Sequence, residues 1–382
     1  MGSCEKASRS RFTQFAVQLE SRLMFPPPPK PPIAPPVVAE ATEAPDATVT
    51  PEAAPSVLPP LPPLTPSSTL VLPEGCDEVL HLMGTTGLAD FLSFARDFAD
   101  LNVPGTGAVN GSTEMDLAEA WRDAADVYEG VATVEAYPNE LPGVFPFPEA
   151  MKAHCEAFLA TPHVQREFDQ VPVAFGMVPL AHLIVALPRL NMTAIRAHGE
   201  AIGNGSIADL ALAQLCLPLD PSSHSLHLLE RGVDTWTFVS DNHDVRLLQA
   251  RAKAGAAATG RGHVGQTLAL ELGFPSNVLN VIRYQNRLIL NNGYHRAYAL
   301  LKRGVTHVPA VIQVCRHWDD IGLVGGATLY ENRAVFVDRA RPPLIRDYAD
   351  RRLCMHFAAP RLRKYIRIRH QIEIGYLRDS AN

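Results

Sequence analysis

Apolar residues recur at helical spacing in three segments of the first half of the chain, and this pattern predicts helices there. The segments cover residues 88–99, 116–131 and 148–159. From Val171 onward the pattern changes to short apolar runs, which are typical of buried strands. We therefore predict a helical subdomain over residues 76–170 and an α+β domain over residues 171–338.

Within the second region, apolar runs and Ala/Leu-rich stretches alternate along the chain. Strands are expected at residues 173–178, 182–187, 235–239, 278–284, 287–290 and 308–314. Helices are expected at residues 207–216, 245–257, 264–272 and 295–303. The pair Gln285–Asn286 separates two apolar runs, which predicts a two-residue β-hairpin.

Proline is distributed unevenly and sets off the N-terminal part of the chain. The sequence contains 33 prolines, and 17 of them lie between Pro26 and Pro73. Because proline fixes φ and lacks a donor, residues 1–75 are predicted to be a disordered, extended proline-rich arm. Such an arm is either a linker or a ligand for a protein partner with a polyproline-binding groove.

The C-terminal residues 339–382 differ from the rest of the chain in charge. Residues 339–378 contain 11 Lys or Arg and 3 acidic residues, although the whole chain has a formal charge of −6. Basic and apolar residues alternate over 361–369, which predicts a strand with one basic face. That face is expected either to bind nucleic acid or to dock on the acidic helical subdomain.

Cysteine spacing and apolar run lengths indicate the compartment. No apolar run reaches the roughly 18–20 residues that span a bilayer, and the N-terminus has no apolar signal region. The six cysteines form no CxxC pair, and no HExxH motif is present, so the sequence gives little support for a zinc site. We expect a cytoplasmic protein that has no membrane partner.

The turn that precedes the helix expected at 295–303 reads Asn-Asn-Gly-Tyr-His-Arg over residues 291–296. Gly293 allows positive φ, and the first amides of the helix lack intrahelical partners and favour anions. His295 and Arg296 add side-chain donors, while Asn292 lies in the same turn. This turn is therefore a candidate phosphate site, although the same residues could instead brace the fold.

The stretch 280–313 resembles the ParB/sulfiredoxin superfamily in its order of hairpin, glycine turn, basic pair, helix, Gly304 and a strand that starts near Pro309. The resemblance implies a mixed sheet with helices, and a nucleotide such as ATP or CTP with Mg²⁺ bound at Asn292, Gly293, His295 and Arg296. Sulfiredoxin-like members have a reactive cysteine where this chain has Tyr294, so sulfiredoxin activity is not expected. No helix-turn-helix pattern follows Gln313, so plasmid partitioning is not expected either.

The segment Asp241-Asn-His-Asp244 is the second candidate for chemistry. Asp241, His243 and Asp244 could bind Mg²⁺ or act as acid and base, and they would be the acidic partner of a metal-bound nucleotide. The same residues also suit a loop followed by a helix N-cap.

Three functions follow from these patterns. The first is binding of a nucleotide or another phosphate ligand at residues 291–296, with phosphotransferase or hydrolase activity if the protein is an enzyme. The second is a non-enzymatic interaction module that uses the proline-rich arm. The third is nucleic-acid binding through the basic C-terminal strand.

Overall fold

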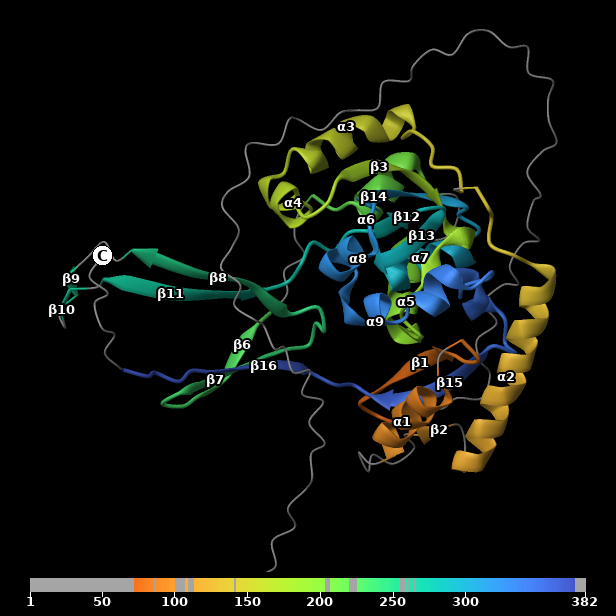
Figure 1. Cartoon of the computed structure of the whole chain (residues 1–382), viewed down its shortest axis with the longest axis horizontal. Coiled ribbons are helices and arrows are strands. Elements are labelled where there is room, and N and C mark those ends of the chain that lie inside the picture. The colour runs from red at the N-terminus through yellow and green to blue at the C-terminus, as the bar shows by residue number, and fades with distance from the viewer. Residues whose placement is uncertain are drawn as a thin grey trace, which may run out of the picture. The chain divides into compact units, whose positions relative to one another are not determined.

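The computed structural model describes residues 72–374, except 86, 100–106, 109–112, 141, 203–206, 220–224, 255–257, 260–261 and 264. The predicted arm therefore lies outside the described residues up to residue 71. The described residues belong to one compact unit that combines helices with several sheets (Figure 1). The predicted α+β class is thus confirmed.

A five-stranded mixed sheet lies at the centre of the unit, in the order β3-β14-β12-β13-β4. Strands β12 and β14 are parallel, as are β13 and β4, whereas β12–β13 and β14–β3 are antiparallel. The strands are β3 (Val173–Pro179), β4 (Ile184–Val185), β12 (Asn280–Tyr284), β13 (Arg287–Asn292) and β14 (His307–Cys315). The predicted hairpin is present, and Gln285 in its turn adopts a φ of 52°.

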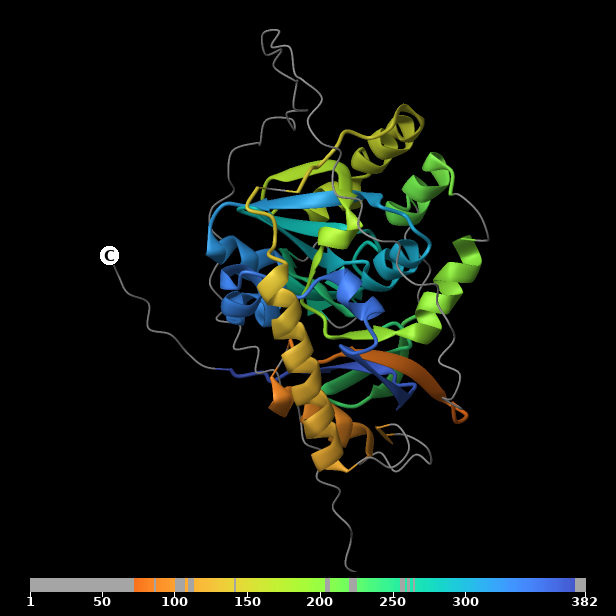
Figure 2. The same ribbon diagram turned by 90° about the vertical axis from the view of Figure 1, so that its right-hand side faces the viewer.

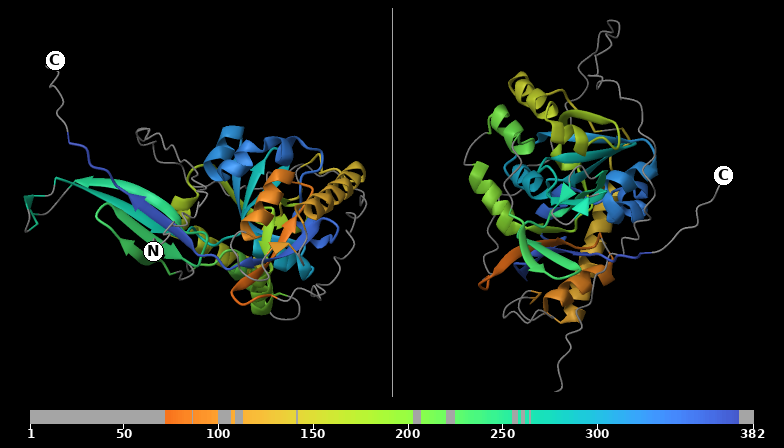
Figure 3. Two further views of the ribbon diagram at one scale, coloured as in Figure 1. Left: turned by 90° about the horizontal axis from the view of Figure 1, so that it is seen from below. Right: turned by 90° about the vertical axis from the view of Figure 1, so that its left-hand side faces the viewer.

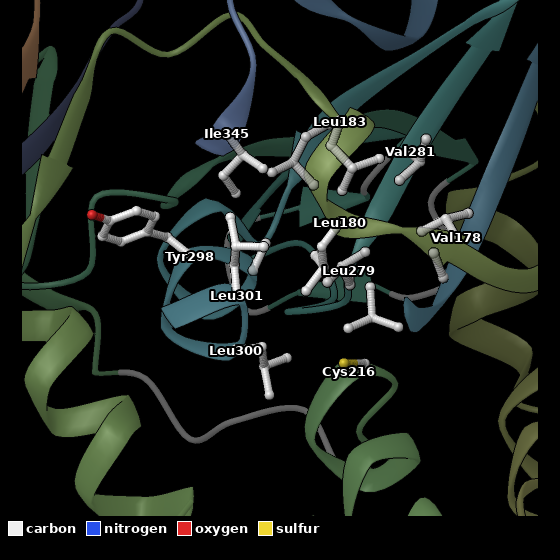
Figure 4. Close-up of a cluster of buried hydrophobic side chains, with 14 of the residues drawn as sticks. Val178, Leu180, Leu183, Cys216, Leu279, Val281, Tyr298, Leu300, Leu301 and Ile345 are labelled. Atoms are coloured by element: carbon white, nitrogen blue, oxygen red, sulfur yellow. The ribbon is translucent and has the colours of Figure 1, made fainter. Parts of the chain in front are cut away.

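Helices cover both faces of this sheet, which explains why its strands are continuous apolar runs. One face packs with α3 (Glu149–Leu159), α6 (Asp209–Cys216) and α7 (Tyr294–Lys302) in the largest apolar cluster. Figure 4 shows part of that cluster, including Leu300 and Leu301 of α7. The other face packs with α8 (Trp318–Val324), α9 (Gly326–Glu331) and a π-helix (Ala334–Asp338).

A second sheet joins residues from opposite ends of the described chain. Its strand order is β2-β15-β1-β5. The strands are β1 (Cys76–Leu82), β2 (Gly107–Ala108), β5 (Arg189–Asn191) and β15 (Cys354–Pro360). Strand β1 pairs antiparallel with β15 over seven residues. The segment predicted as a helical subdomain therefore begins with a strand, and the partner of that strand lies at residues 354–360.

The helices predicted in the same region are confirmed. They are α1 (Leu88–Ala99), α2 (Glu114–Val134) and α3. Two helices that the sequence did not predict are α4 (Pro162–Glu167) and, beyond this region, α5 (Met192–Ile202). The long helix α2, clear in Figure 2, begins at a capping box in which Thr113 and Asp116 bond each other's backbone amides. Gly84 has a φ of +75°, and a Cβ there would lie 2.7 Å from the Ala125 nitrogen, so only glycine lets the turn after β1 approach α2 this closely.

Residues 245–257 and 264–272 were expected to be helices, and that prediction is wrong. They form strands β8 (Arg246–Ala254) and β11 (Gln266–Gly273), which pair as an antiparallel ribbon. Short strands β9 (Ala258–Thr259) and β10 (Gly262–His263) pair between them. Ala/Leu-rich composition favours helices, but cross-strand pairing outweighs that weak preference.

The basic C-terminal strand is confirmed as β16 (Lys364–Arg369). It pairs antiparallel with β7 (Thr235–Ser240), which also pairs with β6 (His227–Arg231) (Figure 3). Arg361, just before the strand, contacts the predicted helical subdomain at Asp77. Arginines of this segment form ion pairs with acids of the chain, namely Arg361–Asp77 at 3.0 Å, Arg363–Asp241 at 2.8 Å and Arg367–Glu230 at 3.9 Å.

Among the described residues, no helix has the length and apolar character needed to cross a membrane.

A buried ion pair joins Arg341 to Asp347 of the 3₁₀ helix Ile345–Ala349, beside α2. Arg341 and Asp347 have side chains that are 2% and 4% exposed, and they form two hydrogen bonds of 2.6 and 2.9 Å. The Tyr128 hydroxyl of α2 donates to the Arg341 carbonyl at 2.6 Å. Each charge is therefore buried only because its partner is present.

We predict that Asp347→Ala lowers the free energy of unfolding by about 3 kcal/mol, because buried Arg341 then keeps only the longer 3.6 Å contact with Glu135 of α2. Urea denaturation measures this loss. Asp338→Ala is the matched control, since its ion pair with Arg333 is exposed and should contribute at most about 1 kcal/mol. Equal losses in the two variants would contradict the assignment.

Candidate functional site

The conformation of the turn that leads from β13 into α7 is held by contacts of Asn292 and Gly293 with the protein itself. Gly293 has a φ of +90°, and a Cβ at this position would lie 3.3 Å from the Cα of Leu279. The Asn292 side chain accepts from the Gly293 amide at 2.7 Å and donates to the Ser276 carbonyl at 3.4 Å. The glycine is therefore required by backbone conformation and close packing, and Asn292 serves the turn itself.

Tyr294 occupies the position after the glycine. Its hydroxyl donates to the Leu290 carbonyl. Burial raises the pKa of this phenol far above its usual value. The side chain is therefore neutral at neutral pH and is not a nucleophile.

Arg296 points into the protein. It is 4% exposed, and its Nη2 donates to the carbonyl and side-chain oxygens of Asn277 at 3.1 and 2.8 Å. Its Nη1 donates to the Cys216 carbonyl at 3.3 Å. These contacts are the structural use of Arg296 that the sequence left open, and they direct its terminal nitrogens away from solvent.

His295 is partly buried beside α5. Its Nε2 accepts a hydrogen bond of 3.0 Å from the Asn191 amide, so the ring proton lies on Nδ1 when the imidazole is neutral. Burial and then the nearby His198 lower the pKa of His295 to about 4, while the charge of Asp244 acts in the opposite direction. His295 is therefore a neutral imidazole at neutral pH.

The residues of the Asp241–Asp244 loop interact with two different parts of the protein. Asp241 forms its ion pair with Arg363, and the His243 Nε2 donates to the Leu362 carbonyl at 2.8 Å. Both therefore fasten the loop to the segment that leads into β16. Of the three residues predicted to carry chemistry, only Asp244 has a charge that acts on His295 of the α7 turn.

A groove of about 200 Å³ lies between α5 and α7, and the sequence analysis missed it. Its lining includes Arg196, Glu200, Ala299 and Arg303. Arg196 forms a 2.6 Å ion pair with Glu78, and the Arg303 Nη2 donates to the Gly199 carbonyl. His295, Ala299 and Arg303 are spaced four residues apart, which places them along one face of α7 and is the signal that could have revealed the groove.

No group of three or more His, Cys, Asp or Glu side chains in the described part of the chain could hold a metal ion. A Mg²⁺ ion brought in by a nucleotide needs only one or two protein carboxylates besides the phosphates. Asp244 is exposed and is the carboxylate near the α7 turn that fits this role.

Comparisons with protein-family models, with curated proteins and with solved structures give no match to this chain.

We predict that Arg296→Ala lowers the free energy of unfolding by about 3 kcal/mol, because the carbonyls of Cys216 and Asn277 lose buried charged donors. Chemical denaturation measures the loss. The matched control is Arg122→Ala, an exposed arginine on α2 that should change stability by less than about 0.5 kcal/mol. An Arg296 variant as stable as the wild type would mean that this arginine does not brace the fold.

We also predict that NMR titration finds a pKa of about 4 for His295, well below the ordinary histidine value. Because the negative charge of Asp244 favours the imidazolium, Asp244→Asn should lower this pKa further. Because the pKa of His295 is lower in the folded state than in the unfolded state, the unfolded state binds a proton more readily. The free energy of unfolding should therefore decrease as the pH falls from about 6.5 towards 4. An unchanged pKa in Asp244→Asn would place Asp244 too far away to matter.

Proposed function

We propose that this chain binds a nucleotide or another phosphate-bearing ligand in the groove between α5 and α7, next to the turn 291–296. The observation that carries the proposal is the pair of arginines, Arg196 and Arg303, in the lining of this groove. Each guanidinium has five N–H donors, and the hydrogen bonds described above use only some of them. Arg303 forms no ion pair among the described residues and supplies the unpaired positive charge for a phosphate, whereas Arg196 shares its charge with Glu78 and adds its remaining donors.

The size of the groove limits what it holds. A volume of about 200 Å³ is below the 300–1,000 Å³ of typical sites that enclose a whole small molecule. We therefore propose that the groove receives the phosphate end, while the sugar and base of ATP or CTP lie outside it. The resemblance to nucleotide-binding ParB/sulfiredoxin-like domains supports this ligand class, and here the donors come from α5 and the end of α7 rather than from Arg296.

If the ligand is turned over, the reaction class we propose is phosphoryl transfer or hydrolysis. Asp244 and neutral His295 are the groups beside the α7 turn that can face Mg²⁺ or exchange a proton. Asp241 and His243 are engaged with the segment that leads into β16. We propose a cytoplasmic location for this function, which agrees with the five free cysteines in the described residues.

The two alternative functions have less support in the described residues. The proline-rich arm lies almost entirely outside them. In the basic C-terminal segment, Arg361, Arg363 and Arg367 form ion pairs with acids of the same chain. A surface that is neutralised in this way attracts nucleic acid phosphates less strongly than the sequence alone predicts.

We predict that calorimetry detects binding of ATP, CTP, GTP or inorganic phosphate, tested with and without Mg²⁺. Arg303→Gln and Arg196→Gln should each weaken that binding by about ten-fold or more, because each removes charged hydrogen bonds to phosphate. Arg122→Gln is the control for the loss of one exposed positive charge, and it should bind like the wild type. Arg296 is unsuitable for this test because its loss is expected to destabilise the fold.

Two results would contradict the proposal. One is the absence of heat with every ligand. The other is binding that is equally strong in wild type, Arg196→Gln and Arg303→Gln, which would place the ligand elsewhere.

A further inference from the structure

A buried carboxylate on β1 is shared by two basic side chains. The Glu78 side chain is 7% exposed. Its Oε1 accepts a 2.6 Å hydrogen bond from the His356 Nδ1, and its Oε2 accepts one of the same length from the Arg196 Nη1. His356 lies on β15 and Arg196 lies on α5, so one carboxylate joins three elements. Arg196 also lines the groove between α5 and α7.

The register of the second sheet explains why these groups meet. His356 lies opposite Leu80, which is two residues from Glu78 along β1. Because alternate residues of a strand share a face, Glu78 and His356 lie on the same face of the sheet. Asp77, which forms an ion pair with Arg361, belongs to the opposite face. The register therefore directs Glu78 and His356 to the side on which α5 supplies Arg196.

Protonation of His356 changes its charge without breaking its hydrogen bond. In the neutral ring the Nδ1 proton is donated to Glu78, and a second proton would be added at Nε2 while the first stays in place. The His356 side chain is 31% exposed, so the ring can exchange this proton with solvent. Histidine is the side chain whose charge changes most readily between about pH 5 and 8.

The other charges around His356 stay fixed during this change. The hydrogen bond from His356 is the largest cause that lowers the pKa of Glu78, and burial acts in the opposite direction. Glu78 therefore stays ionised at neutral pH, and Arg196 stays cationic. The 3₁₀ helix beside β1 adds Asp347, whose charge is paired with Arg341. Proton uptake by His356 thus turns a neutral pair, Glu78 with Arg196, into a group with one net positive charge.

We propose that His356 is a positioning residue for the groove: through Glu78 it sets how much positive charge Arg196 offers to an anion. This inference rests on the phosphate-binding function proposed above and adds its regulation by protons. While His356 is neutral, Glu78 offsets the charge of Arg196. Once His356 is protonated, it offsets Glu78 in turn, so the groove binds an anion more tightly. Solvent screens charges over this range, and we expect a change in affinity of about three-fold.

Thermodynamic linkage gives a test that needs no substitution. If protonation of His356 favours sulfate, then sulfate favours protonation of His356 by the same factor. NMR titration of the full chain at constant ionic strength should show that sulfate raises the midpoint of the His356 titration by about 0.5 pH unit, which is equivalent to three-fold. Sulfate is the probe because, unlike phosphate, it stays a dianion over this range. His163 of α4 is the internal control and should not shift.

Substitutions of His356 give the second test, by calorimetry of sulfate binding at about pH 5 and about pH 8. The wild type should bind about three-fold more tightly at the lower pH. His356→Gln keeps a donor for Glu78 but cannot gain a proton, so it should lose this difference. His356→Lys is charged at both values and should bind at the higher pH as tightly as the wild type does at the lower. His163→Gln should behave like the wild type.

The outcomes separate this inference from the proposed function. Sulfate that binds without moving the His356 titration overturns the inference and leaves the phosphate site standing. A pH difference that persists in His356→Gln does the same. If sulfate binds at neither pH, the groove is not an anion site, and the inference falls together with the proposed function.

Discussion

The buried Arg296 guanidinium holds Cys216 and Asn277 together by hydrogen bonds, although these two residues lie 61 positions apart in the chain. Cys216 ends α6, and Asn277 lies shortly before β12. One guanidinium on α7 donates to both. The Leu279 amide donates to the same Cys216 carbonyl at 2.8 Å. A planar group with several donors is suited to joining three segments in this way, which a lysine could not do.

That constraint also shapes the chemistry of the α7 turn. Burial and then the positive charge of Arg296 lower the pKa of His198, and burial and then His198 lower the pKa of His295. The turn therefore presents neutral imidazoles rather than cations. The guanidinium groups of Arg196 and Arg303 lie instead in the lining of the groove, where Arg196 is paired with Glu78.

The β8–β11 ribbon shows how a local preference can mislead. Its Ala/Leu-rich strands have the composition of helices, and helices were predicted there. The alternation of Leu268, Leu270 and Leu272 was nevertheless present in the sequence and has the period of a strand. Composition and periodicity disagreed, and pairing between two segments about 20 residues apart settled the result. The same alternation explains why one face of the ribbon is apolar.

Short-range patterns were sufficient to predict the helices α2, α3, α6 and α7 and the strands of the central sheet. These helices bury one apolar stripe and these strands bury both faces, so the burial is visible in the spacing of their apolar residues. They were also sufficient for the need for glycine at position 293. The partners of each polar side chain were not readable in this way. Whether Arg296 faces solvent or the Cys216 carbonyl depends on how segments 80 residues apart pack. The pairing of β1 with β15 joins residues more than 270 apart, and no local window contains both strands. Long-range packing alone therefore decided which of the predicted site residues brace the fold.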